Sequence, residues 1–325
     1  MSDPVETMER ARPATMPAAM PAAPADAATS MDPGAPAPMV AAGVVYLDGR
    51  YLPRAEARVS VDDRGFLFGD GAYEVTRAVD GRLFEGERHA RRLARTLRGL
   101  DIALPDAELA ALDDVARRLL RENGLEQGEA AVYLQVTRGA AYPRTHHFPP
   151  AGTRPTVYAA ATRFVPPTTL RERGASVITV PDIRWSRCDL KTVNLLPNAL
   201  AKQAAVAAGA DEAIFVRDGV LMEGSHSNLF AVVDGELRTA PATNYILPGI
   251  TRDVVLELAR EAGIAVREYP LLHAELPRAA ELFLTSTTSD VLPVVRIDGA
   301  TVGAGAPGPV TRRLHELFAL RMYGS

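Results

Sequence analysis

The chain has 325 residues, 47% of them hydrophobic, so it is long enough to bury a large core and to form roughly two domains. Its formal net charge of -4 implies no general attraction to nucleic acid or to an anionic membrane surface. No apolar run approaches the roughly 18 residues that span a bilayer. The single cysteine, Cys188, excludes an intrachain disulfide framework and is typical of a cytoplasmic protein. The six histidines are dispersed, so we predict no metal site.

Residues 1–42 differ in composition from the rest of the chain. They are rich in proline, alanine and methionine and show no hydrophobic periodicity. Such a segment cannot bury enough apolar surface to offset the chain entropy lost on ordering, so we predict that it is disordered. It also lacks the basic start and apolar centre of a secretory signal. A true start at Met31 or Met39 is a further hypothesis, which peptides from upstream of Met31 in native protein would reject.

Short strands and helices alternate from Gly43 onward. Asp-Gly pairs between short apolar runs, the pattern most typical of β-hairpins, occur at 48–49, 80–81, 218–219, 234–235 and 298–299. Strands are predicted over 131–137, 156–161, 175–180, 212–216, 229–233 and 281–285. Helices are predicted over 87–100, 106–122, 196–208, 251–262 and 310–322. Gly124 and Gly263 follow two of these helices as C-terminal caps. The sequence therefore predicts an α+β fold whose sheets are rich in antiparallel pairs.

A domain boundary is predicted at Phe164-Val-Pro-Pro-Thr168, because paired prolines end both helices and strand ladders. The boundary divides the chain into a smaller N-terminal α+β domain over 43–163, a linker over 164–168 and a larger C-terminal domain over 169–325.

Lysine is rare in this chain. Only Lys191 and Lys202 occur, against 34 arginines. A guanidinium cannot condense with an aldehyde, whereas a desolvated amine can lose its proton and do so. Lys202 lies in an alanine-rich helical run, where we expect a surface charge. Lys191 lies in an irregular stretch before that helix, and by itself it is either an ordinary loop lysine or a catalytic amine.

Two segments and one arginine are candidates for anion binding, and one glutamate is a candidate buried carboxylate. Leu247-Pro-Gly-Ile-Thr251 opens a helix, and the free N–H groups of such an end attract an anion. Thr285-Ser-Thr-Thr-Ser289 is dense in hydroxyl groups, and Arg92 is a further candidate for anion binding. Either segment is otherwise a plain cap or loop. Glu223 enters a turn between apolar strands, so it needs a cationic or protonated partner, or else backbone N–H donors.

Several of these residues belong to motifs that resemble a known family. Together, the segments 62–75, 184–191, 223–228 and 247–253 resemble the class IV, fold-type IV aminotransferases, which use pyridoxal 5'-phosphate. A further segment, Thr137-Arg-Gly followed by Pro143-Arg-Thr-His146, is similar to the D-amino-acid aminotransferase branch of that family. The motifs occur in order from about Val44 to the C-terminal helix.

The resemblance implies roles for the cofactor-binding residues, most of them in the C-terminal domain. Lys191 matches the lysine that holds the cofactor as an internal aldimine and then moves the proton between substrate and cofactor. Glu223 matches the carboxylate that faces the pyridine nitrogen and keeps it protonated. The other matched positions are Arg92, the backbone of Ile250 and Thr251, Ser286 and Thr287 around the phosphate, and Leu247 against the ring.

The resemblance also implies a substrate site shared between the two subunits of a homodimer. Tyr73 matches a substrate-side phenol near the lysine. Arg144 and His146 match a trap for the substrate α-carboxylate that the neighbouring subunit supplies, and a guanidinium fixes a carboxylate by two-point contact. His226 departs from the family pattern, which has a small residue there, and it would narrow the side-chain pocket or bind an acidic side chain.

These expectations add up to a cytoplasmic enzyme that transfers an amino group from a D-alanine-like amino acid to a 2-oxo acid such as 2-oxoglutarate. The alternatives on the same scaffold are a branched-chain L-amino-acid or (R)-amine transaminase and an aminodeoxychorismate lyase. The alternative from another class is a cofactor-binding protein without turnover. The presence of both Lys191 and Glu223 argues against it.

Overall fold

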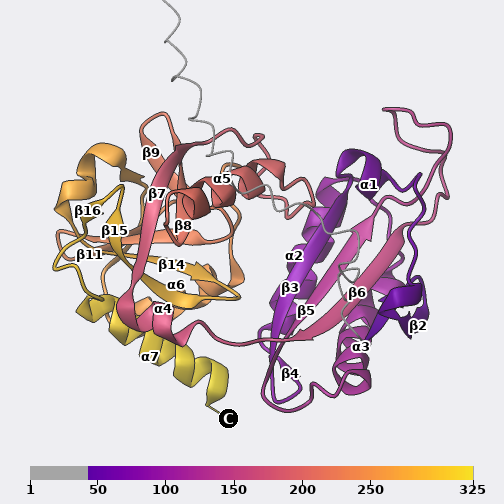
Figure 1. Ribbon diagram of the computed structural model, residues 1–325, viewed down its shortest axis with the longest axis horizontal. Helices are drawn as coiled ribbons and strands as arrows, with labels where there is room; N and C mark the ends of the chain where they lie inside the picture. The colour runs from indigo at the N-terminus through magenta and orange to yellow at the C-terminus, as the bar shows by residue number, and fades with distance from the viewer. Residues whose placement is uncertain (1–42, 325) are drawn as a thin grey trace, which may run out of the picture. The chain divides into compact units, whose positions relative to one another are not determined.

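The computed structural model describes residues 43–324, and the disorder predicted for residues 1–42 lies outside these residues. Two sheets organise the described part of the chain (Figure 1). The first has six strands in the order β2-β1-β6-β5-β3-β4, and every neighbouring pair is antiparallel. Its strands are β1 (Val44–Leu47), β2 (Arg50–Pro53), β3 (Gly71–Val79), β4 (Arg82–Leu83), β5 (Glu129–Thr137) and β6 (Thr156–Arg163).

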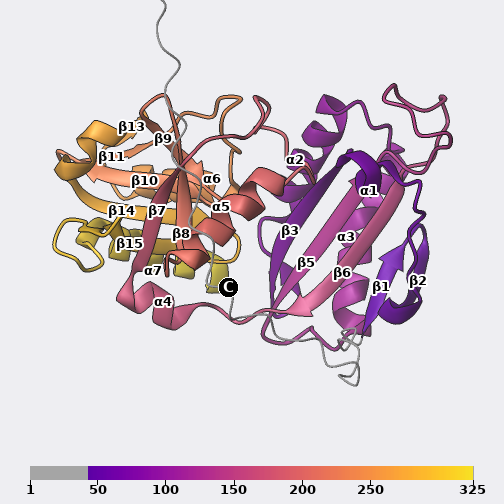
Figure 2. The same ribbon diagram turned by 45° about the horizontal axis from the view of Figure 1, so that its top comes forward.

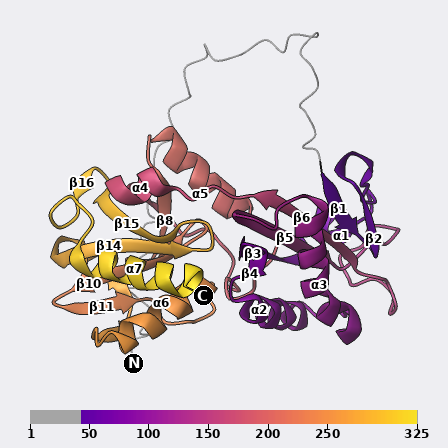
Figure 3. The ribbon, with the colours of Figure 1, turned by 90° about the horizontal axis from the view of Figure 1, so that it is seen from below.

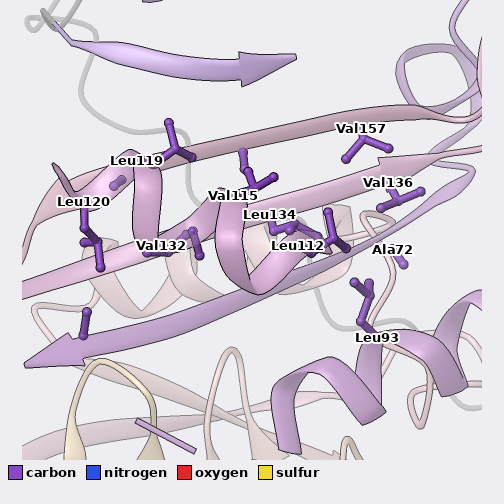
Figure 4. Close-up of a cluster of buried hydrophobic side chains, with 14 of the residues drawn as sticks. Ala72, Leu93, Leu112, Val115, Leu119, Leu120, Val132, Leu134, Val136 and Val157 are labelled. Carbon is purple, nitrogen blue, oxygen red and sulfur yellow. The ribbon is translucent and has the colours of Figure 1, made fainter. Parts of the chain in front are cut away.

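Helices α2 (Gly86–Gly99) and α3 (Asp106–Glu122) cover this sheet, and Figure 3 shows both of them on one side of its strands. Burial alternates along β5, so that Val132, Leu134 and Val136 face the helices. On α3, Leu112 and Leu119 lie two turns apart and face the sheet. These side chains meet in one apolar cluster (Figure 4). The apolar residues that recur with helical spacing and those that recur with strand spacing therefore form a single core.

The second sheet has ten strands, β7 to β16, in the order β12-β11-β10-β14-β15-β7-β8-β9-β13, with β16 paired to β15 (Figure 2). The pairs β7–β8, β7–β15 and β11–β12 are parallel, and the others are antiparallel. The strands are β7 (Ala175–Pro181), β8 (Glu212–Arg217), β9 (Val220–Gly224), β10 (Asn228–Val233), β11 (Glu236–Thr239), β12 (Val266–Glu268), β13 (Leu271–Leu272), β14 (Ala279–Ser286), β15 (Asp290–Ile297) and β16 (Ala300–Thr301). A further pairing of Glu223 with Asn228 joins β9 to β10, so the path from β10 round to β9 closes on itself.

The helices of this second part are α4 (Thr168–Arg173), α5 (Leu196–Ala207), α6 (Ile250–Glu261) and α7 (Pro309–Tyr323). Apolar residues of α6 and α7 pack with Phe230 and Phe283 of the second sheet, whose rings stack with centroids 4.8 Å apart. Phe84, which follows β4, joins the same cluster against Phe318 of α7. This cluster therefore ties the two sheets together. No helix in residues 43–324 is both long and apolar enough to cross a membrane.

All five Asp-Gly pairs form hairpin turns, as predicted. The aspartates have φ angles between 47° and 51°, and the glycines that follow have φ angles between 75° and 88°. Positive φ at both central residues defines the type I′ turn, whose twist matches that of the flanking strands. The predicted caps Gly124 and Gly263 are also confirmed, since their φ angles of 62° and 70° are left-handed.

The five helices expected from periodicity are present, with ends that differ by one residue at most. Periodicity did not predict α1 (Arg64–Phe68) or α4, because five or six residues are too few to show it. The last residue of the expected linker, Thr168, already belongs to α4. The division into domains at this boundary stays a prediction. Lys202 is not the solvated charge that we expected, since its amine contacts the carbonyl oxygen of Asp211.

Candidate active site

One cavity collects most of the residues that the sequence singled out. It is open to solvent, with an empty volume of about 860 Å³, and it is lined by residues of both sheets, α2 and the segments before α5 and α6. Among its lining residues are nine of the predicted positions, namely Tyr73, Arg92, Lys191, Glu223, Leu247, Ile250, Thr251, Ser286 and Thr287. The two predicted positions that do not line it are Arg144 and His146.

Lys191 is fixed through its backbone between β3 and α2. Its carbonyl oxygen accepts a hydrogen bond of 3.0 Å from the backbone N–H of Tyr73, and its own N–H donates to Thr96 Oγ1 at 3.3 Å. The side chain lies against Tyr73, with Nζ 4.3 Å from the ring centroid. Within residues 43–324 this amine has no hydrogen-bond or ion-pair partner. It is therefore a half-buried amine that is available to a ligand in the cavity.

Glu223 lies at the end of β9, fully buried and surrounded by donors. Arg184 Nη1 contacts its Oε1, and Asn228 Nδ2 donates to its Oε2 at 3.0 Å. The backbone N–H of Leu247 is 3.2 and 3.1 Å from the two oxygens. Arg184 is held in turn by Asp182, at 2.9 Å. The cationic partner expected from the sequence is thus Arg184, and a backbone donor is present as well.

Two opposing effects set the charge of Glu223. Burial raises the pKa of its carboxyl to about 7, although the positive charge and hydrogen bond of Arg184 and the N–H of Leu247 act to lower it. All of the hydrogen-bond partners found in the described part of the chain donate to it, and this arrangement fits the ionised form. We therefore regard Glu223 as a carboxylate at and above neutral pH that can take up a proton slightly below it.

Arg92 reaches the cavity from α2 and is held in place by a buried carboxylate of β3. Its Nε and Nη2 each donate to Glu74 at 2.8 Å, and its Nη1 donates to the carbonyl oxygen of Pro248 at 3.1 Å. His89 Nδ1 lies 2.8 Å from the same carboxylate. Burial acts against the charge of Glu74, but Arg92 and His89 together lower the pKa of Glu74 to about 2. Burial lowers the pKa of His89, so this imidazole is neutral with its hydrogen on Nδ1.

The N-terminus of α6 presents free backbone donors beside Arg92. The first intrahelical hydrogen bond runs from Asp253 to the carbonyl oxygen of Gly249, so the N–H groups of Ile250 and Thr251 have no partner within the helix. No side chain caps this end. A Cβ at Gly249 would lie 2.2 Å from Asn228 Oδ1, so only glycine allows the chain to pass here. The end of the helix is therefore a ready anion site.

Hydroxyl groups complete the polar side of the cavity. The hydroxyls of Ser227 and Thr285 are buried, line the cavity and have no hydrogen-bond partner in the described residues. Ser286 Oγ lies 2.7 Å from Ser289 Oγ at the end of β14. A buried hydroxyl without a partner is costly, so these groups indicate a polar ligand. Together with Arg92 and the α6 terminus, they form a site whose chemistry fits a phosphate group.

Arg144 and His146 lie elsewhere, in the loop between β5 and β6. The guanidinium of Arg144 is 4.2 Å from the ring centroid of Phe68, and the ring of His146 is 5.6 Å from the same ring. Arg64 donates to the carbonyl oxygen of Thr145 at 2.8 Å. The loop is thus packed against α1 and does not reach the cavity of its own chain.

Sequence reasoning did not assign three residues that shape the cavity. Arg184 and Asn228 bind Glu223, and Glu74 orients Arg92. The buried carboxylate required a cation, and Arg184 begins the matched segment 184–191, but the sequence did not show which of the 34 arginines contacts Glu223. Glu74 lies in the matched segment 62–75, but nothing in the sequence showed that its carboxylate contacts Arg92.

The chain is similar to known proteins over most of its length. The family described as amino-transferase class IV matches residues 71–297. The chain is 43% identical over 274 residues to the D-alanine aminotransferase of Staphylococcus haemolyticus, covering 84% of this chain and 96% of the relative. It is also 43% identical over 276 residues to the D-alanine aminotransferase of Bacillus licheniformis, covering 83% and 94%.

Solved structures show the same fold. The branched-chain amino acid aminotransferase of Escherichia coli matches with a TM-score of 0.79 at 28% identity, covering 88% of this chain and 96% of the other. The branched-chain aminotransferase of Thermoproteus uzoniensis, solved with norvaline, matches with a TM-score of 0.77 at 28% identity, covering 87% and 96%. Another branched-chain amino acid aminotransferase, complexed with N-(5'-phosphopyridoxyl)-L-glutamate, matches with a TM-score of 0.77 at 30% identity, covering 88% and 95%.

Proposed function

Because the chain belongs to the class IV amino-transferase family, we propose that it binds pyridoxal 5'-phosphate in this cavity and transfers the amino group of a D-alanine-like amino acid to a 2-oxo acid such as 2-oxoglutarate. The observation that carries the proposal is the meeting, in one cavity, of an unpaired lysine, a buried carboxylate and a helix N-terminus. These three groups suit an aldehyde, a ring nitrogen and a phosphate.

When bound, pyridoxal phosphate supplies an aldehyde that reacts with amines and a ring that withdraws electrons from the substrate carbon. Arg92 and the N–H groups of Ile250 and Thr251 would hold its phosphate, with Ser286 and Thr287 as further donors. Leu247 would pack against the ring.

Lys191 would both attach the cofactor and carry the proton. Its amine faces the cavity beside the ring of Tyr73, which shields one side of it from water. As a free amine it can accept the proton from the substrate α-carbon and return it at another atom. Tyr73 would contact the substrate on this side.

Glu223 would bind the ring nitrogen. Its donors Arg184 and Asn228 and the Leu247 N–H fix the direction of the carboxylate. Since the pKa of Glu223 is about 7, the carboxyl can share a proton with a pyridine nitrogen near neutral pH. By sharing that proton, the Glu223 carboxyl would favour a positive charge on the ring, which the reaction needs as an electron sink.

Arg144 and His146 would supply the substrate carboxylate site from the second subunit of a homodimer. This proposal rests on their location, since the loop that carries them does not reach the cavity of its own chain. A guanidinium that binds the carboxylate from one side fixes which enantiomer would direct its α-hydrogen toward Lys191.

The two kinds of comparison favour different substrate stereochemistry. The similar structures are branched-chain aminotransferases at 28–30% identity, whereas the D-alanine aminotransferases reach 43%. A fold is shared more widely than a substrate, so we give the higher identity more weight and favour a D-amino acid. A branched-chain L-amino-acid transaminase is the second candidate.

Absorbance of the cofactor-loaded protein separates these candidates. D-Alanine alone is expected to remove the band of the lysine-bound cofactor, and 2-oxoglutarate is expected to restore it. If L-leucine removes the band and D-alanine does not, the second candidate is correct. If neither amino acid changes the band, the chain is not a transaminase for either class of substrate.

Mixed dimers test the shared site. We would combine subunits that carry Lys191→Ala with subunits that carry Arg144→Ala, each of which is expected to be nearly inactive alone. If Arg144 acts on the neighbouring subunit, each hybrid dimer contains one site with both residues intact, and activity reappears on mixing. If Arg144 acts within its own chain, no intact site forms and the mixture stays inactive.

A further inference from the structure

His226 occupies a place in the cavity that the proposed reaction leaves without a role. It lies with Ser225 at the tip of the connection between β9 and β10, where the N–H of Gly224 donates to the carbonyl oxygen of Ser227 at 2.7 Å. Asn198 of α5 donates to the carbonyl oxygen of Ser225 at 2.7 Å and so anchors the tip. The imidazole lines the cavity, and half of its side-chain surface is exposed.

A buried carboxylate orients this imidazole. Glu212 of β8 is 3% exposed, and its Oε2 lies 2.7 Å from His226 Nδ1. Its other oxygen accepts from Ser225 Oγ at 2.6 Å and from the N–H of Ala213 at 2.8 Å. Burial acts to raise the pKa of Glu212, but its hydrogen bond and charge interaction with His226 leave that pKa below its ordinary value. Glu212 is therefore ionised, and His226 Nδ1 carries a hydrogen.

This arrangement leaves Nε2 of His226 available to form a hydrogen bond with a ligand in the cavity. Within residues 43–324, Nε2 has no hydrogen-bond partner. In the imidazolium form it donates a hydrogen bond and carries a positive charge.

The other basic residues that line the cavity, Arg184, Arg92 and Lys191, already have ion-pair partners or proposed roles. Arg184 is held by Asp182, Glu223 and a backbone carbonyl group, and Arg92 is held by Glu74. The remaining donors of Arg92 adjoin the phosphate site, and Lys191 reacts with the cofactor. His226 is thus the basic lining residue whose second ring nitrogen is left for another anionic group on the substrate.

Resting on the proposed function, we propose that His226, oriented by Glu212, binds the distal carboxylate of dicarboxylic substrates and makes the site prefer them over monocarboxylic substrates of similar length. The chemical class is an amino acid or 2-oxo acid with a second carboxylate at the end of its side chain. Glu212 is a positioning residue in this proposal, because it contacts His226 and does not line the cavity. A charge-assisted hydrogen bond of this kind changes affinity by roughly 10- to 100-fold.

The test compares two ligands that differ by one carboxylate. Calorimetry on the cofactor-loaded protein would measure the dissociation constants of glutarate and butyrate, neither of which can react. His226→Gln keeps a neutral donor for Glu212 but cannot carry charge, so it is the main variant. His226→Ser is the second, and His273→Gln is the matched control, since His273 is an exposed histidine that does not line the cavity.

We expect His226→Gln to weaken glutarate binding by roughly tenfold or more and butyrate binding by much less. Glu212→Gln should lower the same preference by a smaller factor, and His273→Gln should leave it unchanged. The kcat/KM ratio of D-glutamate to D-alanine should fall in parallel. Equal losses for both ligands, or no loss for either, would overturn the inference. Failure of wild-type protein to react with D-alanine would instead overturn the proposed function on which the inference rests.

Discussion

Glu74 and Arg92 are joined by two parallel hydrogen bonds of 2.8 Å, from Nε to one carboxylate oxygen and from Nη2 to the other. Such a two-point contact fixes the plane of the guanidinium as well as its position. A third bond, from Nη1 to the carbonyl oxygen of Pro248, ties Arg92 to the segment that leads into α6. Arg92, which we propose binds the phosphate, is therefore held in a fixed orientation by the protein itself.

Loss of that orientation should weaken cofactor binding. Glu74→Gln keeps the shape of the side chain but loses one acceptor and the charge. We expect the dissociation constant of pyridoxal phosphate to rise by roughly tenfold, which corresponds to about 1.4 kcal/mol. An absorbance titration of the cofactor-free protein measures it. Glu87→Gln, which alters an exposed carboxylate on α2, is the control. Unchanged affinity in the folded Glu74 variant would show that Arg92 does not need this partner.

Glu74 also gives the fold an acid-sensitive component. Its pKa is about 2 in the folded protein against an ordinary value of 4.5, so folding favours its ionised form. The stabilisation is present above about pH 4.5 and is lost as the pH falls toward about 2. Unfolding by urea at several pH values should therefore show a steeper acid loss for wild-type protein than for Glu74→Gln. Parallel curves for the two proteins would contradict this assignment.

The two lysines offer a matched pair of variants. Lys191→Ala is expected to lower turnover by more than the roughly 10²- to 10⁴-fold that general-base catalysis contributes alone, because covalent attachment of the cofactor is lost too. Lys202→Ala removes only a contact with a carbonyl oxygen and should keep most of the activity. Borohydride reduction followed by peptide mapping should place the cofactor on Lys191 in wild-type protein. A label on Lys202 would refute the assignment.

Glu223 should give the stability of the folded protein a pH dependence opposite in sign to that from Glu74. Its folded pKa of about 7 lies above the ordinary value of 4.5, so the folded state holds the proton more tightly than the unfolded state does. This contribution is full below about pH 4.5 and is lost as the pH rises through about 7. The cofactor-free wild type should therefore lose stability relative to Glu223→Gln between about pH 5 and about pH 8. Denaturant unfolding at both ends of that range measures the difference, and a gain by the wild type would reverse the sign that we expect.

Local sequence patterns were sufficient for much of the fold. The Asp-Gly pairs predicted their turns because the φ angles of a type I′ turn are set by two residues alone. Helices such as α3 were predicted to the residue, since two turns or more of periodic burial define them. The strand order of the second sheet was not predicted, because three of its pairs are parallel and one of them, β7–β15, joins strands that are distant in the chain.

The site was predicted only where a motif carried it. Lys191 and Glu223 lie in matched motifs, and the structure brings them to one cavity. The residues that orient Arg92 and His226 were not predicted, because the contacts of Glu74 with Arg92 and of Glu212 with His226 depend on tertiary packing. Arg144 belongs to a motif, yet the role that we propose for it requires a second subunit, and a single sequence carries no direct signal of that arrangement.

The cavity takes its lining from both sheets, from Tyr73 on β3 to Thr287 beyond β14. A ligand seated there touches segments more than 200 residues apart, and the unfolded chain offers it nothing comparable. A ligand bound in this cavity therefore stabilises the folded protein. At a concentration a hundredfold above its dissociation constant, it adds about 2.7 kcal/mol to the free energy of unfolding. The melting temperature of this protein should consequently report the amount of cofactor in its surroundings.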